Sequence, residues 1–156
     1  MDSTSTTVTE EQMEQANALF WSQMLGVEMR RVDSAHCEWM EEVHIAGWCV
    51  LSGAWSGRIE VRMTHGLAMM ATAMMLALPE EHVREADLMD ATKEIANMIV
   101  GTIKSTLPRP CSMTVPEASA ASGAETLRAA AGRSARFCHE QGELIVRLIE
   151  ESDERV

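Results

Sequence analysis

Residues 90–107, DATKEIANMIVGTIKSTL, carry the periodic pattern around which the rest of the chain can be arranged. Placed at about 100° per residue, this stretch forms one amphipathic helix of about five turns. The apolar side of the helix consists of Leu88, Thr92, Ile95, Ala96, Ile99, Val100 and Ile103. We expect this side to pack against the body of the domain.

A narrow polar stripe lies along the opposite side of this helix and consists of Asp90, Glu94, Asn97, Gly101 and Lys104. Glu94 and Asn97 stand on adjacent turns and point the same way. Gly101 is unusual, because a glycine inside a helix costs about 1 kcal/mol relative to alanine. A close approach of something else to the backbone is one sufficient reason to keep a glycine there.

Two interpretations of the polar stripe are open. An amphipathic helix ordinarily has a solvated polar face with no further role. Alternatively, the stripe is functional: the Asn97 carboxamide can donate and accept hydrogen bonds and so hold a water molecule, while the Glu94 carboxylate can hold a cationic group. Asparagine and glycine are poor helix formers, and their presence favours the functional interpretation.

Two more helices are expected earlier in the chain. Thr9 and Gln12 fit a capping box, in which each side chain bonds the other residue's backbone N–H. The helix that they begin should run to about Met24. The second helix is expected at residues 66–78, with Thr64 as its N-terminal cap.

Strands are expected around these helices. Residues 57–63, GRIEVRM, alternate strictly between apolar and charged side chains, as in a half-buried strand. Further strands are expected at 27–32, 39–51, 111–115, 133–138 and 143–149, and the last two should form a hairpin. Residues 117–132, rich in Ala and Ser, fit either a loop or a helix. Because hairpins rather than βαβ units join the strands, we predict an α+β fold: a single domain with an antiparallel sheet of about six strands and long helices packed on it.

The chain has 156 residues, which suits one domain with a real core. We expect that domain at residues 9–150, with a disordered tail at 1–8 and a charged tail at 151–156. The formal charge of −11 argues against binding to duplex nucleic acid and to an anionic membrane surface.

Cysteine use and hydropathy point to a cytoplasmic protein with reduced thiols. The four cysteines are widely spaced, without a CxxC pair, and no secretory signal pattern precedes them. No apolar run reaches the roughly 18 residues that a membrane span needs. His36-Cys37 and Cys138-His139 could in principle meet around zinc, but their spacing matches no zinc motif, so no metal site is expected.

The string from Asp90 to Gly101, DATKEIANMIVG, resembles the signature of the CheC/CheX/FliY family of chemotaxis phosphatases. In that family an Asp or Ser precedes a Glu by four positions, and the Glu precedes an Asn by three. The flanking order is most similar to CheX, with MLG at 24–26, GAWSGRI at 53–59 and a strand before Pro116. Because the spacing from Asn97 to Pro116 is a few residues shorter than in the family, Pro116 is not counted as a site residue.

The resemblance implies a phosphatase that accelerates hydrolysis of the aspartyl phosphate of a CheY-type response regulator. Glu94 would pair with the regulator's active-site lysine, and Asn97 would orient the attacking water. Asp90, Gly101 and Lys104 would contact the regulator. No cofactor is implied on this chain, because the regulator would supply Mg²⁺. This division of roles, in which the regulator brings the metal and this chain positions the lysine and the water, fits phosphoryl transfer. Catalysis of that reaction depends mainly on positioning and electrostatics.

Three further questions stay open at this point. The domain could instead be a non-catalytic CheX-like binding module that docks on a response regulator or a flagellar motor component. Glu14 and Asn17 repeat the Glu-x-x-Asn spacing, either as a second site or as a plain exposed helix face, with Trp21 standing where the signature has glycine. CheX relatives are homodimers joined through their sheets, and the apolar strand at 39–51 could provide an edge for this.

Overall fold

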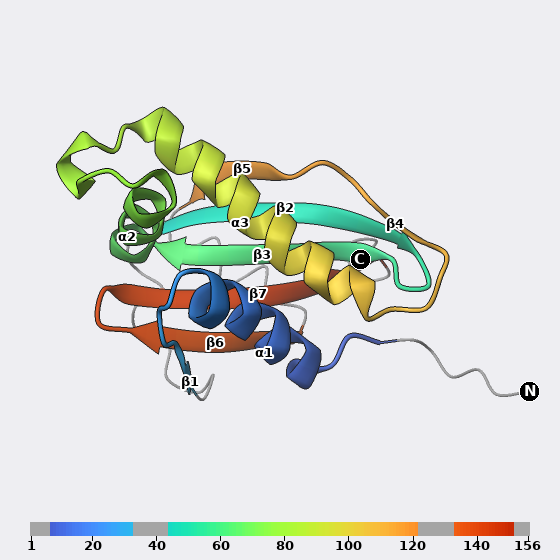
Figure 1. Cartoon of the computed structure of the whole chain (residues 1–156). Helices are drawn as coiled ribbons and strands as arrows, with labels where there is room; N and C mark the ends of the chain where they lie inside the picture. Colours follow the sequence, from blue (N-terminus) through green and yellow to red (C-terminus); the bar gives the residue numbers. More distant parts are fainter. Residues whose placement is uncertain (1–6, 33–43, 122–132, 152–156) are drawn as a thin grey trace, which may run out of the picture.

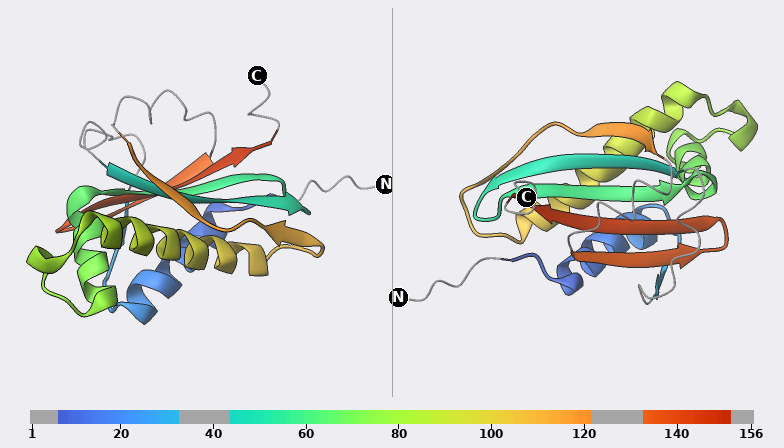
Figure 2. Two further views of the ribbon diagram at one scale, coloured as in Figure 1. Left: turned by 90° about the horizontal axis from the view of Figure 1, so that it is seen from above. Right: turned by 180° about the vertical axis from the view of Figure 1, so that it is seen from behind.

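One antiparallel sheet organises the structure, a computed structural model that describes residues 7–32, 44–121 and 133–151. The strands are β1 Arg30–Val32, β2 His44–Gly53, β3 Gly57–Thr64, β4 Cys111–Met113, β5 Glu117–Ala121, β6 Arg133–His139 and β7 Gly142–Glu150. Within the described residues the seven strands follow the order β1-β6-β7-β3-β2-β4, and β5 also pairs with β2. The helices all lie on one face of this sheet (Figures 1 and 2). The predicted α+β class is therefore confirmed.

The helical elements are α1 Glu10–Ala18, the π-helix η1 Leu19–Met24, α2 His65–Leu76, the short 3₁₀ turn η3 Glu80–His82 and α3 Glu85–Ser105. In Figure 1, α3 lies across β2 and β3, while α1 lies over β6. The capping box is confirmed, because the Thr9 backbone N–H donates to Gln12 Oε1 at 2.6 Å and the Gln12 backbone N–H donates to Thr9 Oγ1 at 3.1 Å.

Helix α3 has the predicted apolar face. Its buried residues are Leu88, Ala91, Thr92, Ile95, Ala96, Ile99, Val100 and Ile103. The start predicted at Asp90 is wrong, since the helix begins at Glu85. The Asp87 carboxylate accepts a hydrogen bond from the Arg84 backbone N–H at 3.0 Å and so caps an additional turn.

A glycine on β2 fixes the distance between α3 and the sheet. A Cβ added to Gly47 would lie 2.8 Å from the backbone oxygen of Thr92 and 3.0 Å from Ala96 Cβ. Only glycine leaves room for this contact. The close packing holds the inner side of α3 against β2 and directs its outer side away from the sheet.

Two predicted helix features are wrong in detail. The first helix is not one α-helix to Met24, because residues from Leu19 onward form the π-helix η1. Thr64 occupies the N-cap position of α2 but makes no capping bond there. Its Oγ1 instead accepts a hydrogen bond from the Glu143 backbone N–H at 3.0 Å, which ties α2 to the start of β7.

The strand predictions are mostly confirmed, with two corrections. The hairpin is present as β6 and β7. Residues 117–121 are a strand rather than a loop or helix, because the long β2 pairs with both β4 and β5 along one side. As β3 occupies the other side of β2, the prediction that this strand is a free edge is wrong. Residues 33–43 and 122–132 lie outside the described part, so part of the predicted strand 39–51 does too.

The face of the sheet opposite the helices carries buried charges. The side chain of Glu60 on β3 is only 2% exposed and accepts hydrogen bonds from Arg147 at 2.7 Å and Arg62 at 2.9 Å. Burial alone would raise the pKa of the Glu60 carboxyl, but the positive charges of Arg62 and Arg147 hold that pKa below its usual value. Strand β3 is therefore buried on both faces, more deeply than the predicted half-buried strand.

Candidate functional site

The polar stripe of α3 is accessible. Asp90 and Glu94 are exposed, and Asn97, Gly101 and Lys104 are partly exposed. Within the described residues, the Glu94 and Asn97 side chains make no hydrogen bond or ion pair. At about 1.5 Å per residue, the stripe is about 21 Å long. It therefore offers a carboxylate and a carboxamide whose hydrogen-bonding groups are available to a partner.

Gly101 is not required by packing against any residue that the structure describes. A Cβ added there would meet only the terminal methyl of Met113, at 3.9 Å, which is ordinary van der Waals contact. The glycine therefore costs helix stability without an internal steric reason.

A groove of about 380 Å³ lies beside Asn97, between α3 and η1. It is lined by Leu19, Phe20, Met24, Asn97, Met98, Gly101, Thr102 and Ser105. Leu19 and Met24 on η1 are 40% and 57% exposed, which is unusual for large apolar side chains so near each other. Together these two residues form an apolar wall, here called the η1 wall, next to the Glu-x-x-Asn pair.

The helical periodicity of the sequence does not reveal the η1 wall. The helical pattern predicts ordinary α-helix through Met24, and a π turn moves side chains away from the positions that an α-helix would give them. The available signal was a run of apolar residues, Leu19 to Trp21 and Met24 to Leu25, that a single buried stripe cannot accommodate.

A second hollow, of about 490 Å³, lies at the C-terminal end of the stripe. Gly101 and Lys104 line it together with Arg109 and Cys111. Neither Lys104 nor Arg109 forms an ion pair within the residues that the structure describes. This end of the stripe is therefore locally positive in a chain whose formal charge is −11.

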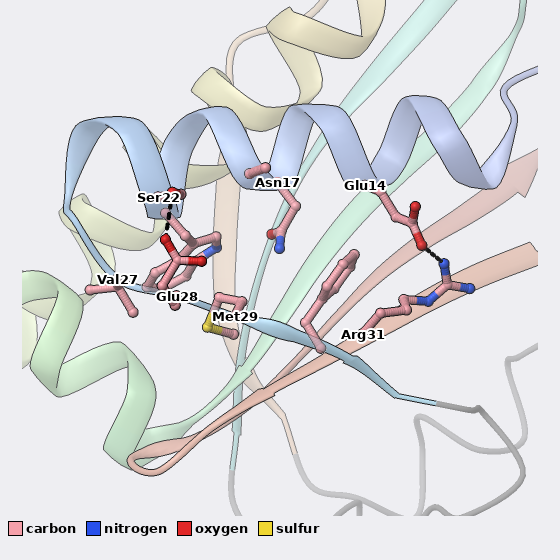
Figure 3. Close-up of a pocket in the computed structure, with 10 residues that line it drawn as sticks. Glu14, Asn17, Ser22, Val27, Glu28, Met29 and Arg31 are labelled. Carbon is pink, nitrogen blue, oxygen red and sulfur yellow. Dashed lines mark hydrogen bonds and ion pairs between the residues drawn. The ribbon is translucent and has the colours of Figure 1, made fainter.

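The pair Glu14 and Asn17 lies in a different environment. Asn17 is only 1% exposed and points into a cavity beneath α1, while Glu14 forms an ion pair with Arg31 on β1 (Figure 3). The interpretation of Asn17 as part of a plain exposed helix face is therefore wrong. A buried carboxamide also cannot reach into the active site of another protein, so Asn17 lacks the accessibility that Asn97 has.

Metal-ligating side chains do not gather in the described part of the chain: no group of three or more His, Cys, Asp or Glu residues there could hold a metal ion. His36 and Cys37, weighed above as zinc ligands, lie outside the described residues. Cys49, Cys111 and Cys138 are free thiols, and burial raises the pKa of Cys49 to about 11. In the same described part, no helix is long and apolar enough to cross a membrane.

Comparison with known proteins gives a consistent result. The sequence model of the family described as "Chemotaxis phosphatase CheX" matches residues 45–139. CheX from Vibrio vulnificus superposes with a TM-score of 0.72 at 18% identity, over 94% of this chain and 100% of that chain. The CheX–CheY–BeF3–Mg²⁺ complex from Borrelia burgdorferi gives 0.65 at 15% identity, over 92% and 98%. A CheC-like superfamily protein from Shewanella sp. PV-4 gives 0.68 at 15% identity, over 90% and 96%. No curated protein matches the chain.

The antiparallel sheet with its helices on one face thus has the fold of CheX and CheC-like proteins. The family model covers more than half of the sequence, and the chain belongs to the CheX family. The resemblance found in the sequence is confirmed.

Proposed function

We propose that this CheX-family protein accelerates hydrolysis of the aspartyl phosphate of a CheY-type response regulator. The observation that carries the proposal is the accessible pair Glu94 and Asn97, without partners in the described residues and next to a glycine that internal packing does not require. The Borrelia burgdorferi relative, crystallised with CheY, BeF3 and Mg²⁺, supports a response regulator as the partner of this chain.

In the proposed reaction, α3 completes the active site of the regulator. Glu94 pairs with a lysine of the regulator and fixes the relative position of the two proteins. The Asn97 carboxamide holds a water whose oxygen forms a bond to phosphorus while the bond from phosphorus to the aspartate oxygen breaks. The products are inorganic phosphate and a free carboxylate. Mg²⁺ is expected to arrive with the regulator and to neutralise charge on the phosphoryl oxygens.

The remaining contacts follow from the groove beside Asn97. A regulator that reaches Asn97 must also cover the η1 wall, because Asn97 and Leu19 line the same groove. Burying these apolar side chains would contribute to affinity and would keep bulk water away from the reacting group. Asp90 and Lys104, at the two ends of the stripe, would contact the regulator's rim. The reaction would take place in the cytoplasm, where response regulators act.

The test is the decay of phosphate on the regulator with and without this protein. We expect Asn97→Ala to reduce the acceleration of phosphate decay by about 100-fold, because the attacking water is no longer oriented. Binding of the regulator should persist. Glu94→Gln should weaken both binding and turnover. Glu80→Ala, an exposed carboxylate on η3 away from the stripe, is the matched control and should behave as wild type.

A non-catalytic binding module is the rival function, and the same assay separates the two. Tight binding of the phosphorylated regulator with no change in phosphate decay would favour the module and contradict the phosphatase.

A homodimer remains a separate proposal. With β2 paired on both sides, the available sheet edges in the described residues are β1 and the outer sides of β4 and β5. A sedimentation experiment that finds only monomer at micromolar concentration would contradict the homodimer.

A further inference from the structure

A partly open cavity of about 280 Å³ lies beneath α1 and η1, on the side away from α3, and the exposed Glu28 lies at its edge (Figure 3). Asn17 and Trp21 line it from the helical side, and Glu28, Arg31 and Phe137 line it from β1 and its neighbours. None of these residues belongs to the polar stripe or the η1 wall. The cavity is therefore a separate feature that the proposed phosphatase reaction does not use.

Two polar atoms in this cavity lack partners. Asn17 is 1% exposed and its Oδ1 has no hydrogen-bond donor, and Trp21 is fully buried with no acceptor for its indole N–H. Buried polar atoms in folded proteins are nearly always hydrogen-bonded. In Figure 3 the Asn17 carboxamide points into the cavity. An unpaired acceptor and an unpaired donor thus line the same small space.

The charges around the cavity favour a cation. Arg31 is already neutralised, because it forms ion pairs with both Glu10 and Glu14. At the other end, the Glu28 carboxylate accepts one hydrogen bond, from Ser22 Oγ at 2.9 Å, and keeps further acceptor capacity. The Trp21 ring adds aromatic surface, which attracts cations, whereas the Phe137 ring already has the Arg31 guanidinium over it, 5.8 Å from the ring centroid.

We propose that this cavity binds a small organic ammonium ion that also carries an acceptor oxygen, such as an amino alcohol. The ammonium group donates to Asn17 Oδ1 and to the Glu28 carboxylate, and the ligand oxygen accepts from the Trp21 indole N–H. The hydrocarbon part lies against Phe137 and Trp21. Every unpaired polar atom of the cavity lining then has a partner, and the charge of Glu28 is balanced.

The test is calorimetric titration of the full-length protein with ethanolammonium chloride, at constant ionic strength, alongside ¹⁵N spectra of the indole N–H groups. We expect saturable binding and a shifted indole resonance. Glu28→Gln should weaken the affinity by about tenfold, the usual scale for one charge-assisted hydrogen bond. Asn17→Leu should abolish binding. Glu11→Gln, an exposed carboxylate of α1 outside the cavity, is the control and should bind as wild type.

Several results would overturn the proposal. They are the absence of saturable binding, equal binding by Glu28→Gln, and equal affinity for neutral acetamide. A crystal structure soaked in ethanolammonium that shows only ordered water on Asn17 would do the same. Because Glu28→Gln lies outside the polar stripe, regulator phosphate decay should stay unchanged in it, so this test succeeds or fails independently of the phosphatase assay.

Discussion

At Gly101 the effects that we expect of a larger side chain on stability and on docking have opposite signs. Because a Cβ at this position meets only Met113 Cε at 3.9 Å, we expect Gly101→Ala to raise the free energy of unfolding by up to about 1 kcal/mol. Gly101→Leu should weaken binding of the phosphorylated regulator, because the larger side chain would hold its backbone away. Urea unfolding and a titration with regulator measure the two effects.

The control for this pair is Glu85→Leu, an exposed residue in the first turn of α3 that lies about 120° around the helix axis from Asn97. It should leave regulator affinity unchanged. If Gly101→Leu binds the regulator as tightly as wild type does, Gly101 has no role in docking.

Residue by residue, the stripe of α3 was predictable from sequence and the setting of Asn17 was not. The 3.6-residue period alone places Glu94 and Asn97 opposite Ile95 and Ile99. Asn17 shows the limit of this reasoning, because the cavity that buries it is completed by residues of β1 and β6, distant in sequence. No local pattern records which strands a helix will pack on.

At the scale of elements, the π-helix η1 brings apolar surface to the stripe. We expect Leu19→Asp to raise the concentration of regulator needed for half-maximal phosphate decay, with little change in the maximal rate, since Leu19 would contact the partner but not the phosphoryl group. Leu78→Asp is the matched control, because Leu78 is 39% exposed against 40% for Leu19 and lies outside the groove. Equal behaviour of the two variants would exclude the η1 wall from the interface.

The buried charges between β3 and β7 make a prediction for stability. Glu60→Gln leaves Arg62 and Arg147 without their carboxylate, and breaking such a buried pair costs about 3 kcal/mol. The folded pKa of Glu60 is lowered, so its stabilising effect is present above the unfolded value of about 4.3 and is lost as pH falls through the folded pKa.

Urea unfolding of wild type and Glu60→Gln between pH 7 and pH 3 measures this. The difference between the two proteins should shrink in acid, and a constant difference across the range would contradict the assignment. Glu81→Gln, exposed on η3, should change stability by less than about 0.5 kcal/mol at any pH.

The type of an element could be predicted from sequence where the hydrophobic pattern extends over many residues, as in α3, or alternates strictly, as in β3. Predictions of element type were wrong where pairing with another strand decides the structure. Residues 117–121 have the composition of a loop or helix, yet they form β5 because ten-residue β2 extends past β4 and leaves hydrogen-bonding groups to be satisfied. The π turn of η1 likewise depends on how Phe20 and Trp21 are buried, which the helical pattern does not contain.

For the whole molecule, we propose that the folded domain of residues 9–150 also includes Thr7 and Val8 at its N-terminal end. Val8 is fully buried, and Arg133 donates a hydrogen bond to Thr7 Oγ1 at 2.7 Å. We expect a chain trimmed to residues 7–151 to unfold within about 0.5 kcal/mol of full length. Trimming to 10–151 should cost about 1 kcal/mol for the Thr9 cap, and more for Val8. Thermal unfolding compares the three chains, and equal stability of all three would show that Val8 and Thr9 contribute nothing.

Gly47 ties the two layers of the molecule together at a point where even a methyl group has no room. Because Gly47 lies on β2, on the inner side of α3, it cannot contact the regulator that we propose to dock on the outer side. A genetic selection for loss of phosphatase function should nevertheless recover substitutions at codon 47 beside those at codons 94 and 97. Such alleles would produce a folded protein whose α3 is displaced, and suppressors of them should map to Thr92 and Ala96 rather than to the regulator gene.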